Sequence, residues 1–143
     1  MSSITIYHNS QCCTSRNVLA LIRNTGAEPV IIEYLVTPPT LEKLTELLAQ
    51  MAIPARDLLR QKGALYDELK LNDLTLSDNA LIDAMLAHPI LMNRPIVQTA
   101  WGTRLCRPSE AVIDILPLPQ QAKFTKEDGE PVINEQGERI AGH

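Results

Sequence analysis

The sequence has few aromatic residues and lacks a long hydrophobic run. Phe, Trp and Tyr together make up 3% of the 143 residues, although 45% are hydrophobic, so the core must consist of Leu, Ile, Val, Ala and Met. No stretch approaches the roughly 18 apolar residues that suggest a membrane-spanning helix. The first residues, MSSITIYHN, show no basic region followed by an apolar run, so we expect neither a membrane span nor a signal peptide.

The chain also lacks an excess of basic residues, and it has few cysteines. Its formal net charge is −4, which argues against a general surface for nucleic acid or anionic membranes. A local group of arginines could still bind a small anion. The three cysteines show no metal-binding spacing, so the sequence predicts free thiols in a reducing cytoplasm and no metal site.

Residues 4–22, ITIYHNSQCCTSRNVLALI, are the stretch around which the chain is organised. Ile4–Tyr7 predicts a short strand, and the apolar residues after Thr14 recur at helical spacing. Cys12 therefore lies at the joint between a polar loop and the start of a helix. Free N–H groups and the positive end of the helix dipole favour an anion there, and a thiolate over a thiol.

The remaining elements predict an α/β fold. The first helix should end near Asn24, and the continuous apolar run 30–32 predicts a buried strand. Residues 39–88 read as helices only, with N-caps at Thr40 and Ser77, and a short helix over 55–61. Segments 96–99 and 103–106 predict a hairpin, and a last helix should begin at 108–110.

This order predicts one domain over residues 1–119, with a helical insertion at about 39–89. From residue 120 the composition becomes charged and contains glycine, which predicts a polar C-terminal extension over 120–143. Two interpretations of that extension stay open. It could contain a weak hairpin around 134–137, or it could be a mobile tail.

Four separated segments resemble the ArsC family of glutaredoxin-dependent arsenate reductases. They are the loop with His8-Asn9, Cys12 and Thr14-Ser15-Arg16, then LLRQK around Arg60, HPILMNRPIV around Arg94 and TRLCRPSE around Arg107. The resemblance extends from Ser3 to about Leu116. It implies a thioredoxin- or glutaredoxin-like mixed four-stranded sheet. One departure is Cys13, because the family commonly has glycine or another small residue after the nucleophile.

The resemblance implies an oxidoreductase of arsenic detoxification that reduces arsenate to arsenite through a thiol adduct on Cys12. Glutathione would be the co-substrate and glutaredoxin the protein partner, with no bound cofactor. Arg60, Arg94 and Arg107 would bind arsenate and its products, since guanidinium groups bind tetrahedral oxyanions bidentately. Each arginine taken alone is more typical of a solvated surface. Pro95 matches the proline that is cis in thioredoxin-like folds.

Five residues near Cys12 are candidates for supporting the loop or the thiolate: His8, Asn9, Thr14, Ser15 and Arg16. A protonated His8 would favour the thiolate, but it could equally be only a turn residue. Ser15 occupies the second position of a C-x-x-C motif, so the usual internal disulfide cannot form. Cys106 is expected to pack in the core, and a disulfide between the neighbours Cys12 and Cys13 would be strained.

Two alternatives from other functional classes remain. Spx-type redox-sensing transcription regulators share the fold, but they resemble a C-x-x-C switch that Ser15 interrupts here. A glutathione-dependent thiol oxidoreductase that does not act on arsenate is the other. The arsenate reductases with a phosphatase-like loop are excluded, because the sixth residue after Cys12 is Val18 and not arginine.

Overall fold

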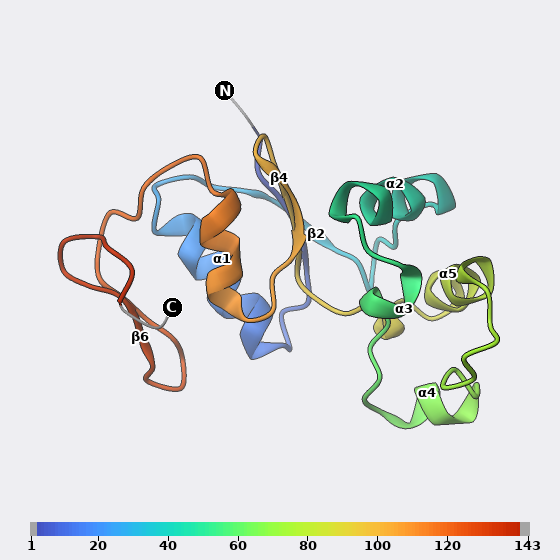
Figure 1. Ribbon diagram of the computed structural model, residues 1–143. Coiled ribbons are helices and arrows are strands. Elements are labelled where there is room, and N and C mark those ends of the chain that lie inside the picture. The colour runs from blue at the N-terminus through green and yellow to red at the C-terminus, as the bar shows by residue number, and fades with distance from the viewer. Residues whose placement is uncertain (1–2, 141–143) are drawn as a thin grey trace. The chain divides into compact units, whose positions relative to one another are not determined.

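The computed structural model describes residues 3–140, which form two compact units. The first unit combines the residues before Glu33 with those from Arg94 onward, and the second is Glu33–Asn93. Figure 1 labels the elements, whose bounds are β1 (Thr5–His8), α1 (Cys13–Arg23), β2 (Val30–Glu33), α2 (Leu41–Met51), α3 (Ala55–Leu58), α4 (Ala64–Glu68), α5 (Asp78–Ala87), η1 (Pro89–Leu91), β3 (Ile96–Thr99), β4 (Gly102–Leu105), η2 (Ser109–Ile115), β5 (Phe124–Thr125) and β6 (Pro131–Ile133).

A mixed four-stranded sheet forms the centre of the first unit, in the order β2-β1-β3-β4. β1 runs antiparallel to β3, with Thr5 opposite Gln98, and β3 and β4 form the predicted hairpin, with Thr99 opposite Gly102. This arrangement confirms the thioredoxin-like fold class predicted from the sequence. The register matters for the site because it fixes both Arg94 and Arg107 just outside the paired strands.

The core of the first unit lies between the sheet and two helical segments. α1 and the 3₁₀ helix η2 pack against each other, as Figure 1 shows for the blue and orange helices. α1 is amphipathic, so it buries Val18, Leu21 and Ile22 on one side. Residues from both ends of the chain fill this core, among them Ile6, Val97, Cys106, Val112 and Ile133.

One local prediction was wrong, and another is refined by the structure. β2 is an edge strand, with Val30 55% and Ile31 37% exposed, and not a buried strand. A short apolar run does not reveal whether a strand has one neighbour or two. The last helix begins at Ser109, as predicted, but it is a 3₁₀ helix, in which the Ala111 N–H donates to the carbonyl of Pro108. Over only two turns, apolar spacing cannot separate a period of 3.0 residues from 3.6.

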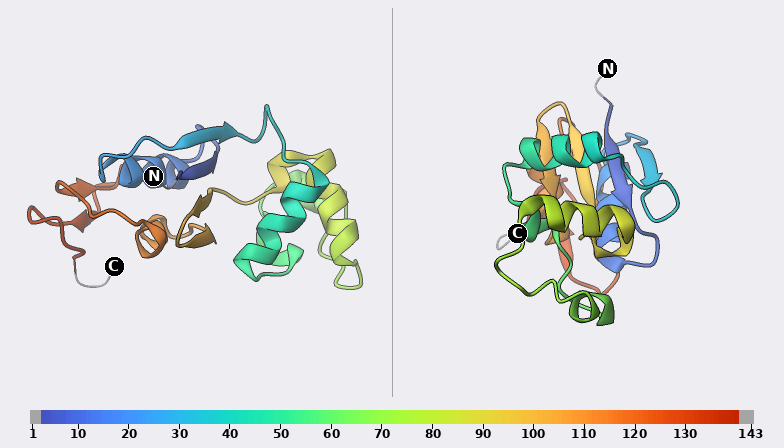
Figure 2. Two further views of the ribbon diagram at one scale, coloured as in Figure 1. Left: turned by 90° about the horizontal axis from the view of Figure 1, so that it is seen from above. Right: turned by 90° about the vertical axis from the view of Figure 1, so that its right-hand side faces the viewer.

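The second unit is built from α2 to α5 with η1 (Figure 2). The hydroxyl oxygens of Thr40 and Ser77 accept hydrogen bonds from backbone N–H groups three residues later, so both predicted N-caps are confirmed. α3 ends at Leu58, earlier than the predicted helix over 55–61. Among residues 3–140, no helix is long and apolar enough to cross a membrane.

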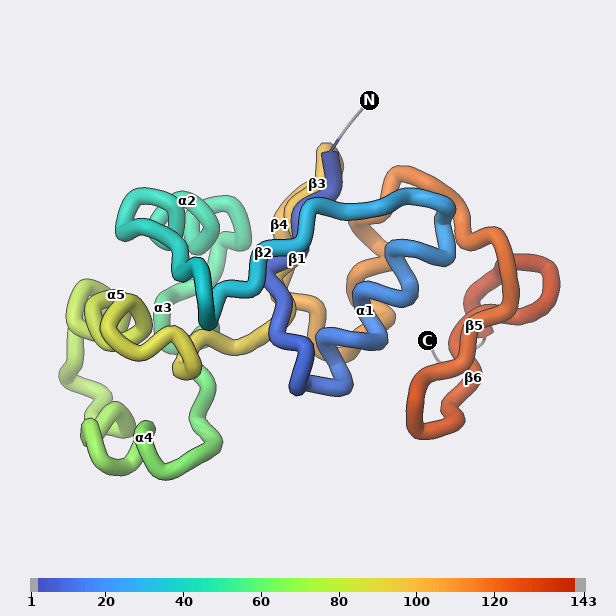
Figure 3. Tube along the Cα trace, turned by 180° about the vertical axis from the view of Figure 1, so that it is seen from behind, coloured from blue at the N-terminus to red at the C-terminus, as the bar shows by residue number. Residues whose placement is uncertain are grey.

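The residues after Pro119 include a two-stranded hairpin of β5 and β6, drawn in red in Figure 3. Val132 and Ile133 are fully buried in the core of the first unit. A second turn follows at Asn134, where the Gly137 N–H donates to the Asn134 carbonyl at 3.0 Å. This turn lies where the hairpin interpretation placed it, around residues 134–137.

Candidate active site

Cys12 is the N-cap residue of α1, and its backbone is extended (φ −101°, ψ 121°). Its N–H donates to the Asn9 carbonyl at 3.0 Å, which closes the turn before it. Its carbonyl accepts the first helical hydrogen bond, from the Arg16 N–H at 3.0 Å. The nucleophile candidate is thus held by hydrogen bonds on both sides, at the place in the fold that the sequence predicted.

The surroundings of Cys12 favour its thiolate form. Partial burial raises the pKa of the thiol, but hydrogen bonds from the Ser15 N–H, the Arg94 and Arg107 guanidiniums and the Thr14 N–H outweigh it. The pKa of Cys12 is therefore lowered from its ordinary value. Backbone N–H groups at a helix start and nearby arginines are the environment in which protein thiols become nucleophilic.

Two of the three predicted arginines lie at the thiol. Arg107 donates from Nη1 to Cys12 Sγ at 3.9 Å and to the backbone carbonyl of Arg94 at 2.9 Å. Arg94 is only 6% exposed, although it carries a charge, and it too donates to the thiolate. The peptide bond between Arg94 and Pro95 is cis, which is the isomer the resemblance implied. The bond before Pro108 is also cis, which no feature of the sequence predicted.

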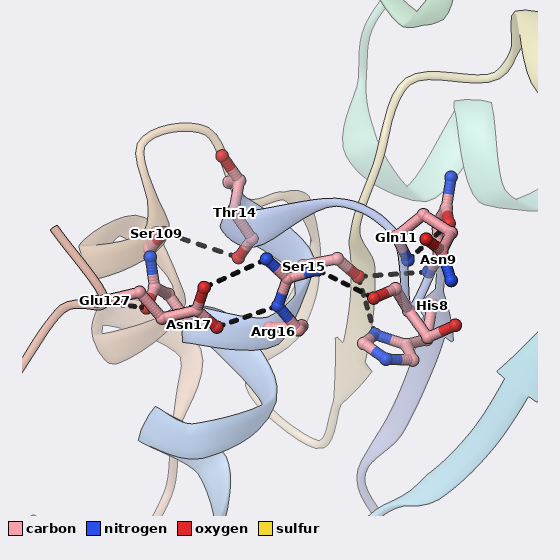
Figure 4. Close-up of polar contacts among 10 residues, drawn as sticks. His8, Asn9, Gln11, Thr14, Ser15, Arg16, Asn17, Ser109 and Glu127 are labelled. Atoms are coloured by element: carbon pink, nitrogen blue, oxygen red, sulfur yellow. Dashed lines mark hydrogen bonds and ion pairs between the residues drawn. The ribbon is translucent and has the colours of Figure 1, made fainter.

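The Ser15 side chain links α1 to the end of β1 through hydrogen bonds (Figure 4). It is fully buried, and its hydroxyl lies 2.6 Å from His8 Nδ1 and accepts from the Asn9 N–H at 3.1 Å. Asn9 also accepts from the Gln11 N–H through Oδ1 at 2.9 Å. His8, Asn9 and Ser15 therefore form one polar group that shapes the loop, and the Ser15 hydroxyl is used inside the fold.

Arg16 and Thr14 connect the loop to residues later in the chain. Arg16 donates from Nη1 to the Ser10 carbonyl at 2.8 Å and forms an ion pair with Glu127. The carbonyl of Thr14 accepts from the Ser109 hydroxyl at 3.4 Å. Sequence reasoning missed the contributions of Ser109 and Glu127 to this loop, because they depend on contacts across about a hundred residues.

Comparison with known proteins decides the family. The model of the ArsC family matches residues 7–115. The chain belongs to the ArsC family. An arsenate reductase of Yersinia enterocolitica is 60% identical over 140 residues, covering 98% of this chain and 99% of the relative, and one of Escherichia coli K12 is 58% identical with the same coverage. A solved arsenate reductase structure from Vibrio cholerae has a TM-score of 0.76 and 46% identity, covering 80% of this chain and 98% of the other.

The other two cysteines of this ArsC-family chain differ in environment. Cys13 is exposed at the first position of α1. Cys106 is buried, and burial raises its pKa to about 12. Cys106 is therefore the packed core thiol that the sequence predicted, and it stays protonated near neutral pH.

Arg60, the third arginine implied by the ArsC resemblance, belongs to the second unit. It follows α3, and its N–H donates to the carbonyl of Leu91. Its role in binding an anion stays a prediction. Over residues 3–140, no cluster of three or more His, Cys, Asp or Glu side chains is placed to hold a metal ion.

Proposed function

We propose that this chain reduces arsenate to arsenite, with Cys12 as the nucleophile. The observation that carries the proposal is the Cys12 sulfur at a helix start, 3.9 Å from Arg107 and with a lowered pKa. Relatives with 56–60% identity over nearly the full chain are arsenate reductases, which supports the same substrate here. Free thiols further suggest that the protein works in a reducing compartment such as the cytoplasm.

In the first step the Cys12 thiolate attacks arsenic and an oxygen of arsenate leaves as water, which gives a covalent thiol adduct. Glutathione then displaces a second oxygen, so that arsenic is bonded to both sulfurs. A thiolate of glutaredoxin then attacks the glutathione sulfur of this adduct, the bond from arsenic to that sulfur breaks with its electron pair left on arsenic, and a disulfide between glutaredoxin and glutathione forms. Water displaces the Cys12 sulfur from the trivalent arsenic, which leaves as arsenite, and Cys12 is again a free thiol.

Arg94 and Arg107 stabilise the oxyanion and the charge that develops as oxygen leaves. Their guanidinium groups can each bind two oxygens of a tetrahedral anion, which a lysine ammonium cannot reproduce. Arg60 is proposed as the third anion ligand on the resemblance to the family. His8, Asn9 and Ser15 keep the loop in the shape that presents the sulfur.

The structure offers no ready internal reductant among its described residues, which supports an external thiol. Ser15 replaces the second cysteine of a C-x-x-C motif, and its hydroxyl already contacts His8 and Asn9. Cys106 is buried and its pKa is about 12, so it is a poor nucleophile. A bridge from Cys12 to its neighbour Cys13 would be strained. Glutathione and glutaredoxin are therefore the proposed partners.

The test is turnover of arsenate with glutathione, glutaredoxin, glutathione reductase and NADPH. Cys12→Ser should abolish NADPH oxidation, and Cys13→Gly is the matched control that should retain it. Substantial turnover by Cys12→Ser would exclude Cys12 as the nucleophile.

A second arm replaces glutathione and glutaredoxin with thioredoxin and its reductase. We expect no turnover in this arm. Robust turnover that is lost in Cys13→Gly or Cys106→Ser would reveal an internal disulfide relay and overturn the glutathione mechanism.

A further inference from the structure

The ion pair between Arg16 and Glu127 connects the C-terminal hairpin to the loop of the nucleophile (Figure 4). Arg16 donates to both carboxylate oxygens of Glu127, from Nε at 2.8 Å and from Nη2 at 2.9 Å. Its remaining nitrogen, Nη1, donates to the Ser10 carbonyl at 2.8 Å. The guanidinium therefore bridges a carboxylate from far along the chain to a carbonyl two residues before Cys12.

Glu127 is itself held in place by its neighbours. Its N–H donates to Asn17 Oδ1 at 3.1 Å, so the backbone of the hairpin also contacts the N-terminal half of α1. The preceding residue, Lys126, is mostly buried and pairs with Glu110 at 3.0 Å and Glu130 at 2.8 Å. These contacts place the carboxylate where the planar fork of Arg16 can meet it with both nitrogens.

The Ser10 carbonyl matters because Ser10 lies inside the turn that sets the position of Cys12. That turn is closed by the hydrogen bond from the Cys12 N–H to the Asn9 carbonyl. An exposed ion pair adds little to the free energy of unfolding. The pair of Arg16 and Glu127 is therefore better explained by its effect on the position of the Ser10 carbonyl. We propose that Glu127 is a positioning residue for Cys12, acting through Arg16 to hold the Ser10 carbonyl and the turn around it.

This inference rests on the proposed role of Cys12 as the nucleophile, and it goes beyond that role by assigning a function to the C-terminal hairpin. Placing a reacting atom even 1 Å away can cost up to about a hundredfold in rate. In Glu127→Ala the turn keeps its other hydrogen bonds, so the loss of rate should be smaller than a hundredfold. We expect Glu127→Ala to lower kcat for arsenate by roughly tenfold, with the KM for arsenate changed less than about twofold.

The chain contains a matched control on the same helix. Arg23 and Glu28 form another exposed bidentate pair, with both hydrogen bonds at 2.9 Å, at the opposite end of α1 from Cys12. Glu28→Ala removes a carboxylate of the same kind without touching the loop. It should leave kcat and KM unchanged, so it measures any general effect of losing such a pair.

Three measurements distinguish positioning from a loss of stability or a change in local charge. The thermal midpoint of Glu127→Ala should match that of Glu28→Ala. The pKa of Cys12, followed by the pH dependence of its alkylation, should not rise, because the substitution removes a negative charge nearby and no positive one. In an Arg16→Ala background, Glu127→Ala should cause no further loss of kcat, because the effect passes through Arg16.

Amide hydrogen exchange at the Cys12 N–H tests the turn without any substrate. Glu127→Ala should speed exchange there by about tenfold or more relative to Glu28→Ala. Faster exchange in a protein that does not reduce arsenate would refute the proposed function and keep the positioning role. Equal exchange and equal kcat in the two variants, or an undiminished effect of Glu127→Ala without Arg16, would overturn the inference.

Discussion

Replacing Arg107 by methionine should raise the pKa of Cys12, because it removes a guanidinium that stabilises the thiolate. Two unit charges at the observed 3.9 Å interact by about 1 kcal/mol in water and about 4 kcal/mol at an effective dielectric constant near 20. Cys12 is partly exposed and the guanidinium charge is delocalised, so a value between these limits applies. A loss of about 1.4–2.7 kcal/mol of thiolate stabilisation corresponds to a roughly ten- to hundredfold fall in the thiolate-to-thiol ratio, since a tenfold change equals about 1.4 kcal/mol.

The sign follows from which form Arg107 stabilises. The guanidinium lowers the free energy of the thiolate and not of the thiol, so its removal moves the equilibrium toward the thiol. At pH values below the original pKa, the thiolate fraction falls roughly tenfold for each unit by which the pKa has risen, and between the original and the new pKa it falls by less. Alkylation of Cys12 near neutral pH should slow accordingly, although the intrinsic reactivity of the thiolate rises slightly with its pKa.

The assay is the pH dependence of iodoacetamide alkylation, measured by mass spectrometry in a Cys13→Ser background. That background removes the exposed neighbouring thiol, and Cys106, buried with a pKa of about 12, does not compete. Arg104→Met is the matched control, because Arg104 pairs with Asp114 and does not contact Cys12. An unchanged midpoint for Arg107→Met, or an equal rise for Arg104→Met, would refute the electrostatic argument.

Two further predictions concern the anion site and the hairpin. Arg94→Lys should lower kcat/KM for arsenate by about tenfold or more despite the retained charge, because the bidentate fork is lost; wild-type activity would exclude such a contact. Ile133→Ala should lower the free energy of unfolding in urea by about 2–4 kcal/mol, because Ile133 is fully buried. Phe124, only partly buried, pairs with Ile133 across the hairpin, and Phe124→Leu should cost clearly less. Equal losses would mean that the hairpin does not complete the core.

The sequence predicted the centre of the site because its signals are local. A strand, a polar loop and a helix start are each visible within ten residues, so Cys12 could be placed at the joint. The resemblance to the ArsC family implied that Arg94 and Arg107 bind the substrate, and the structure places both near the thiol. The signals for the N-caps Thr40 and Ser77 are equally local, because each side chain accepts a hydrogen bond from the backbone N–H three residues later.

What the sequence did not predict depends on contacts between distant residues. The hairpin has only two fully buried residues, Val132 and Ile133, inside a charged segment, so composition indicated a polar extension and not its part in the core. The pairing of Arg16 with Glu127 spans 111 positions and has no local signature. The exposure of Val30 likewise depends on strand order, because β2 lies at the sheet edge and the same apolar run would suit a central strand.

The first unit is discontinuous in sequence, which has a consequence for synthesis on the ribosome. β1 cannot pair with β3 until the intervening residues, including the whole second unit, have emerged. Val132 and Ile133, which complete the core, emerge later still. The second unit is continuous and helical, so its contacts are local and can form early. We therefore expect the helices of the second unit to fold before the apolar face of α1 is buried. During that interval the nascent chain depends most on chaperones.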